Sequence, residues 1–77
     1  MELHPIASNM TELRIAGHTI LFSYSTPVAG YGSRGAFRTD KWYSPTTTRH
    51  INKYLGKGVG EVISQEAINK MVERNGQ

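Results

Sequence analysis

The sequence predicts an α+β fold in which a small antiparallel sheet of about four strands, arranged as β-hairpins, is followed by two helices. Three observations predict this fold. Apolar and polar residues alternate in the first half of the chain, turn residues separate the alternating segments, and the apolar period becomes helical after Ser44. The chain has 77 residues, which fits a single domain, residues 1–77, with one small core. Because such a core supplies little stability, a homo-oligomer is one expected state.

The first two strands are predicted at residues 11–16 and 19–25. The first alternates apolar and polar residues, as a half-buried strand does. Gly17-His18 lies between the two segments, and glycine there fits the first central position of a type II′ turn. The second segment has apolar residues on both faces, which indicates a more central strand.

Two shorter strands, residues 28–31 and 36–40, are predicted to form a second hairpin. Pro27 precedes them and interrupts the earlier segment. Since proline lacks the N–H that a sheet ladder uses, it indicates a strand end or an edge position. The connecting loop, residues 32–35, has glycine at both ends, which suits a hairpin.

Ser44 indicates the start of the first helix, because serine is a good N-cap and the proline after it costs no hydrogen bond. Gly56 is expected to end this helix. A short extended link, residues 59–63, then leads to Ser64. Ser64 is the expected N-cap of a second, amphipathic helix that runs to about Arg74.

Composition argues against an enzyme and against a bound cofactor. The chain has no cysteine, which excludes disulfides and thiolate zinc sites. His4, His18 and His50 lack the short spacings of metal ligands, and His4 and His18 are expected to face solvent. No apolar segment is long enough for a signal peptide or a membrane span. We therefore expect a cytoplasmic protein with no membrane partner, no metal and no cofactor.

Positive charge is concentrated in one part of the chain. The formal net charge is +3, yet residues 34–57 hold six basic residues and one acidic residue. This concentration favours nucleic acid or an acidic protein surface as the partner, and the alternative is an ordinary solvated surface. The six basic residues are Arg34, Arg38, Lys41, Arg49, Lys53 and Lys57.

Within this region, Arg49, Lys53 and Lys57 have the i, i+4, i+8 spacing of a stripe along one helix face. Just before the helix, Trp42 and Tyr43 follow a lysine, and aromatic residues interleaved with basic ones are typical of single-strand binding or of a protein hot spot. The alternative for Trp42 is a place in the core.

Two further segments have residues suited to anions. Ser44, Thr46 and Thr47, with Arg49 and His50, place hydroxyls, N–H groups and positive side chains at a helix N-terminus. The alternative is that the serine only caps the helix and the threonines pack through their methyl groups. Arg34, between glycines, either enters a groove or a partner's pocket or belongs to a flexible hairpin tip.

Several short motifs are spread over about half of the chain: Phe22-Ser23-Tyr24, Thr26-Pro27-Val28-Ala29, Phe37-Arg38-Thr39-Asp40-Lys41, Ser44, Thr46-Thr47, His50-Ile51-Asn52-Lys53 and Leu55. With these motifs the chain resembles a family of small uncharacterised phage and prophage proteins. The resemblance implies a viral accessory protein inside a bacterial host, where such proteins bind a host factor, a defence complex or nucleic acid. It implies no catalytic or binding residue.

Charge, aromatics and the lack of catalytic residues together predict a small basic binding module, with nucleic acid as the first expected partner. The alternative function is a protein-binding inhibitor or adaptor of a host or defence complex that uses the same basic and aromatic face.

Overall fold

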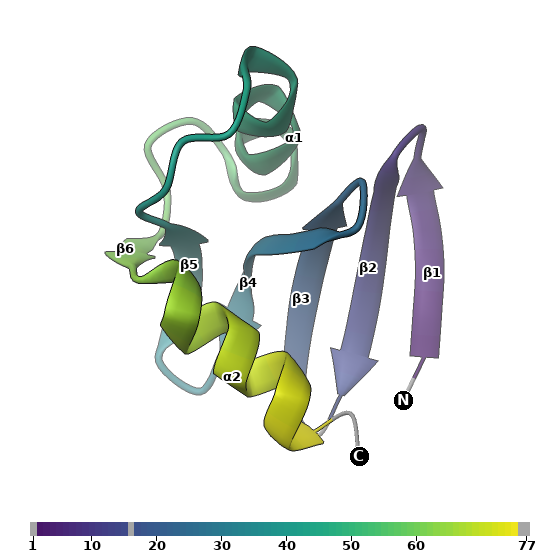
Figure 1. Cartoon of the computed structure of the whole chain (residues 1–77), viewed down its shortest axis with the longest axis vertical. Helices are drawn as coiled ribbons and strands as arrows, with labels where there is room; N and C mark the ends of the chain where they lie inside the picture. Colours follow the sequence, from purple (N-terminus) through teal and green to yellow (C-terminus); the bar gives the residue numbers. More distant parts are fainter. Residues whose placement is uncertain (1, 16, 76–77) are drawn as a thin grey trace.

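The computed structural model describes residues 2–15 and 17–75, with side chains as far as Glu73 (Figure 1). Six strands and two helices are formed within these residues. In chain order they are β1 (Glu2–Ala7), β2 (Met10–Ile15), β3 (His18–Ser23), β4 (Thr26–Gly32), β5 (Gly35–Thr39), α1 (Pro45–Leu55), β6 (Glu61–Ile63) and α2 (Gln65–Asn75).

The six strands form one open sheet in sequence order, β1 to β6, and neighbouring strands are antiparallel except for the parallel pair β5 and β6. The α+β class is confirmed, but the expectation of about four strands is wrong. β1 was missed because Leu3 and Ile6 are exposed and because Ile6 is an extra residue where the register with β2 shifts. The expected extended link contains β6, whose pairing with β5 no local pattern predicts.

The strands from β1 to β5 are joined by two-residue turns. Ile15 pairs with His18, so His18 belongs to β3 and the expected Gly17-His18 turn is wrong. Gly17 has a φ of +83°, while Ala16 lies outside the described residues. His18 is therefore a half-buried strand residue, and the expectation that it faces solvent is wrong. Tyr24 begins the turn between β3 and β4 with a φ of 58°, which is uncommon for an aromatic residue.

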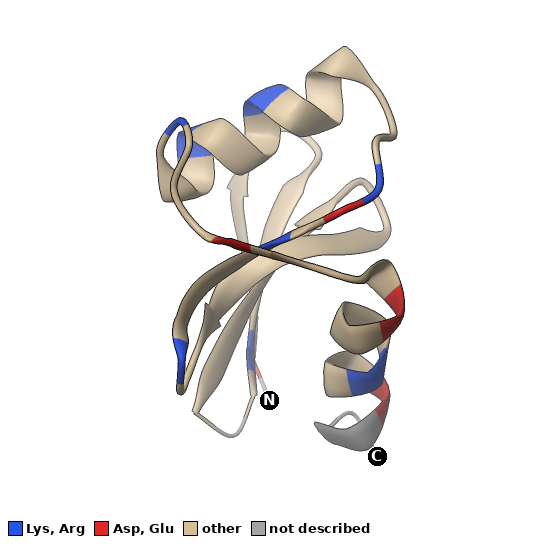
Figure 2. Ribbon diagram, turned by 90° about the vertical axis from the view of Figure 1, so that its left-hand side faces the viewer, with Lys and Arg blue, Asp and Glu red and all other residues tan. Residues whose placement is uncertain are grey.

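The two helices cover opposite faces of the sheet (Figure 2). Successive residues of β3 show this, because Leu21 packs in a cluster with α1 and Ile20 in a cluster with α2. The expected single core is thus two smaller clusters separated by the sheet. Neither helix within the described residues is long and apolar enough to cross a membrane.

Gly30 in β4 allows an unusually close approach of its neighbours. A Cβ atom at this position would lie 2.2 Å from the carbonyl oxygen of Thr19 and 2.8 Å from Cζ of Phe37. The ring of Phe37, which is buried, therefore lies against a strand position where only glycine leaves room. This ring belongs to the cluster on the α2 face.

Candidate functional site

Basic side chains lie on the outward side of α1, as the sequence predicted. Arg49, Lys53 and Lys57 are exposed, and the sequence of α1 contains no acidic residue (Figure 2). Lys57 differs from expectation in one respect, since α1 ends at Leu55 and this lysine lies in the following turn. Only two of the three cations are therefore on the helix itself.

Ile51 and Leu55 hold the opposite side of α1 against the sheet. Both are buried in the cluster that also contains Leu21. This apolar contact fixes the rotation of α1, so Arg49 and Lys53 point away from the sheet. The basic stripe is a consequence of how the helix docks.

The loop before α1 presents a largely exposed aromatic ring. Trp42 is 69% exposed, so its placement in the core is wrong and it is free for contact. Tyr43 packs against the α1 cluster, and Nζ of Lys41 lies 5.3 Å from the centre of the Tyr43 ring. This cation–π contact holds a lysine beside the exposed tryptophan.

The N-terminus of α1 is capped from within, which limits it as an anion site. Oγ of Ser44 accepts a hydrogen bond from the Thr47 N–H at 3.1 Å, and the Ser44 carbonyl accepts one from the Thr48 N–H at 3.1 Å. Pro45 has no N–H, so Thr46 supplies the remaining donor of the first turn. The Thr46 hydroxyl itself accepts from Arg49 at 3.3 Å. Most of the expected anion-binding groups already have partners in the chain.

His50 takes part in a polar network between α1 and the sheet. Its Nδ1 lies 2.8 Å from Oγ of Ser23, which also lies 3.1 Å from Oγ1 of Thr47. Ser23 and Thr47 are buried, so the network anchors α1 to the sheet. Thr47 therefore packs through its hydroxyl, not only through its methyl group.

Tyr24 is a surface residue that sequence reasoning missed. It is 55% exposed, and its ring centre lies 5.9 Å from that of His50. It borders α1 because its turn folds back beside the helix. The sequence signal was weak, since an aromatic residue after a strand is ordinarily assigned to the strand itself, as it was here.

Tyr54 joins α1 to the sheet through a hydrogen bond to Glu12, and this bond shifts the pKa of both groups. The Tyr54 hydroxyl donates to Oε2 of Glu12 at 2.5 Å, and the Tyr54 and Tyr31 ring centres are 5.7 Å apart. Burial and this hydrogen bond raise the pKa of Tyr54 to about 12. The same hydrogen bond lowers the pKa of Glu12.

Two of the predicted cations lie outside the α1 surface. Arg38 makes intramolecular hydrogen bonds: its guanidinium donates to the carbonyls of Val59 at 2.9 Å and Gly56 at 3.1 Å. It fixes the connection from α1 to β6. Arg34 lies in the turn between β4 and β5, and Figure 1 shows that this turn is at the ends of the two strands that point away from α1.

No group of three or more His, Cys, Asp or Glu residues that could hold a metal occurs in the part of the chain that the structure describes. The described fold and surface define a small α+β domain with one helix on each face of a six-stranded sheet and a basic outer surface on α1.

A sequence profile of the family of unknown function DUF8033 matches residues 1–70, and the chain belongs to this family. The match covers all six strands, α1 and the first half of α2. No curated protein and no solved structure matches the chain.

Proposed function

We propose that this chain is a small, basic, non-enzymatic binding module that contacts nucleic acid through α1 and the loop before it. The observation that carries the proposal is the acid-free face with exposed Arg49, Lys53 and Lys57, next to a loop in which Trp42 is 69% exposed. Arginine and lysine neutralise phosphates, and an exposed tryptophan provides a ring on which an unpaired base stacks. A single strand is therefore the preferred ligand.

The setting we propose is that of a phage-type accessory protein in the cytoplasm of a bacterial host. The resemblance of several short motifs to those of small phage and prophage proteins supports this setting. A basic domain of this size needs no catalytic centre to act there, because occupying a strand or a partner is sufficient.

The test is binding of a labelled single-stranded oligonucleotide, followed by anisotropy as salt is raised. The logarithm of affinity should fall with the logarithm of salt concentration, with a slope of about −0.7 per phosphate contact. Charge reversal in the double variant Arg49→Glu, Lys53→Glu should abolish binding, while Lys70→Glu on the exposed side of α2 should retain most of it. Trp42→Ala should cost about 1–3 kcal/mol of binding free energy by loss of stacking.

Absence of binding at low salt would contradict this proposal. So would a loss in Lys70→Glu of about half that in the double variant, because each reversed charge would then count equally and binding would reflect net charge alone. Circular dichroism of each variant shows whether the fold is retained.

The alternative function is a protein-binding inhibitor or adaptor of a host or defence complex. The same exposed tryptophan favours it, since tryptophan beside basic residues is typical of interface hot spots that meet an acidic surface. A pulldown from nuclease-treated bacterial lysate separates the two functions. A protein that is retained by the wild type and lost with Trp42→Ala favours the alternative, whereas loss of all binding after nuclease treatment favours nucleic acid.

A further inference from the structure

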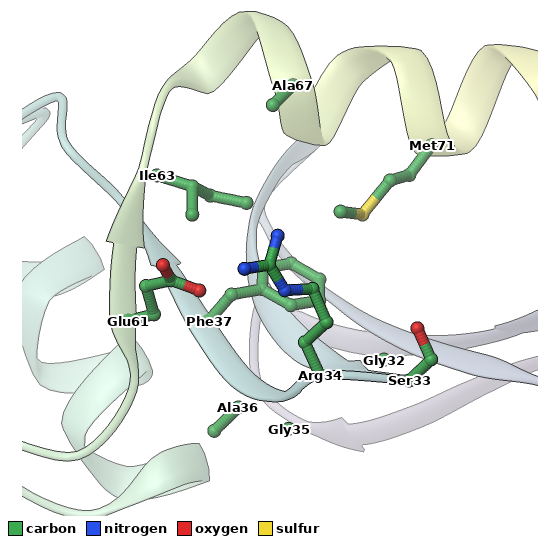
Figure 3. A pocket seen from close by; sticks show the side chains of 10 residues that line it. All are labelled: Gly32, Ser33, Arg34, Gly35, Ala36, Phe37, Glu61, Ile63, Ala67 and Met71. Atoms are coloured by element: carbon green, nitrogen blue, oxygen red, sulfur yellow. The ribbon is translucent and has the colours of Figure 1, made fainter.

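A pocket of about 220 Å³ lies on the α2 face, away from the α1 surface. Its walls come from the turn between β4 and β5, from β6 and from α2 (Figure 3). Phe37, Ile63, Ala67 and Met71 form its apolar lining. The space is smaller than the roughly 300–1,000 Å³ of pockets for drug-sized ligands, so it suits a molecule about as large as one amino acid.

The sequence builds this pocket in two ways. Gly30 allows the Phe37 ring to lie against β4, and the glycine-flanked turn lets Arg34 stand at the pocket margin. The parallel pairing of β5 with β6 sets Glu61 opposite Phe37, so that both face α2. The pocket therefore depends on β6, one of the two strands that sequence analysis did not predict.

Two charges of opposite sign border the apolar lining. The guanidinium of Arg34 reaches over the pocket, and the Glu61 carboxylate lies to one side of it (Figure 3). Within the described residues, neither side chain has an ion-pair partner, and the two do not form an ion pair with each other. A ligand that neutralises both carries one anionic and one cationic group, as a free amino acid does with its carboxylate and its ammonium group.

We propose that this pocket binds a free α-amino acid with an apolar side chain, such as leucine. The carboxylate of the ligand pairs with Arg34, its ammonium group pairs with Glu61, and its side chain contacts Phe37 and Ile63. A simple fatty carboxylate fits less well, because Glu61 repels it, and an amine fits less well, because Arg34 repels it. The proposal is independent of nucleic-acid binding, since the site lies on the other face of the sheet.

The experiment is a titration of the isotopically labelled chain, followed by the backbone NMR signals of Gly35 and Ala67. L-leucine should shift both signals with a saturable curve. Glycine lacks the side chain, leucinamide lacks the carboxylate and 4-methylpentanoate lacks the ammonium group. Each should bind at least about tenfold more weakly, because each loses one of the three contacts.

The variants Arg34→Gln and Glu61→Gln should each weaken leucine binding by about tenfold or more, while Lys70→Gln, on the outer side of α2, should not change it. The NMR spectrum itself reports whether each variant is folded, and the ligand series on the wild-type chain decides the outcome if one is not. Lack of a saturable shift with leucine, or equal affinity for leucinamide or 4-methylpentanoate, would overturn the proposal.

Discussion

The two helices lie against the same sheet but combine apolar and polar contacts in different proportions. α1 adds polar bonds to its apolar contacts, from His50 to Ser23 and from Tyr54 to Glu12. α2 depends mainly on apolar burial, with Ile68 fully buried among the residues of its cluster, and it has one side-chain hydrogen bond to the sheet, from Nε2 of Gln65 to the Pro27 carbonyl at 2.7 Å. Their outer sides differ as well, because α2 carries charges of both signs, with Lys70 paired to Glu66, whereas the charged residues of α1 are both cations. Among the described residues, Arg49 and Lys53 have no acidic partner, so their charge is available to another molecule, and this distinguishes the α1 side.

The largest effect on stability is expected from the apolar contacts of α2. Ile68→Ala removes a fully buried side chain and should lower the free energy of unfolding by about 2–5 kcal/mol, measured by urea denaturation. Val62→Ala is the control, since this residue is 62% exposed and should change stability by less than about 0.5 kcal/mol. Similar losses in both variants would mean that α2 is not held by burial of Ile68.

A smaller effect is expected from the buried polar contact of α1. Ser23→Ala leaves Nδ1 of His50 without its serine partner and should cost about 1–3 kcal/mol in the same assay. Ser25→Ala, in the exposed turn, should be close to neutral. If Ser23→Ala were as mild as Ser25→Ala, the polar network would not contribute to the docking of α1.

The smallest effect, and the one that depends on pH, is expected at Tyr54. Tyr54→Phe removes the hydroxyl that donates to Glu12 and should cost about 1 kcal/mol at neutral pH. Tyr31→Phe, on the neighbouring ring, is the control, because its hydroxyl is not part of this bond.

The sign of the pH dependence follows from the two pKa shifts. The pKa of Tyr54 is raised to about 12 from 10.0, so its contribution is present below pH 10 and is lost as pH rises through about 12. The pKa of Glu12 is lowered from 4.5, so its contribution is present above that pH and is lost as pH falls further. The stability difference between wild type and Tyr54→Phe should therefore shrink at both extremes. A difference that does not change with pH would contradict the assigned bond.

Local signals predicted the helices well. Ser44 caps α1 and Gly56 ends it, with a φ of +107°, and Ser64 accepts from the Ala67 N–H at the start of α2. These features succeed because a cap acts within one turn of chain, where residue type and spacing are sufficient. The central position of β3 was also predictable, because the adjacent apolar residues Ile20 and Leu21 point to opposite faces of a strand. Both are buried in the structure.

Features that depend on distant segments were not predictable. β6 is a strand only because it pairs with β5, and two of its three residues are exposed. The pocket between the β4–β5 turn and α2 depends on both elements at once. Trp42 shows the same limit, because composition favours burial of a lone tryptophan, while its place in the loop after β5 exposes it. The basic stripe was predictable because residue spacing along one helix determines it. The separation of Arg34 from the stripe was not, because it depends on how the strands and α1 pack together.

The two-residue turns have a consequence for how quickly the chain folds. Strands β1 to β5 each pair with the strand next to them in sequence, so hairpin contacts close short loops and carry little entropic cost. β6 is the exception, because it returns to β5 only after the whole of α1. Thr39 and Ile63 therefore meet late, and the folding transition state should contain the hairpins without the parallel strand. The Arg38 contacts with Gly56 and Val59 then form after the rate-limiting step, so losing them should speed unfolding more than it slows folding.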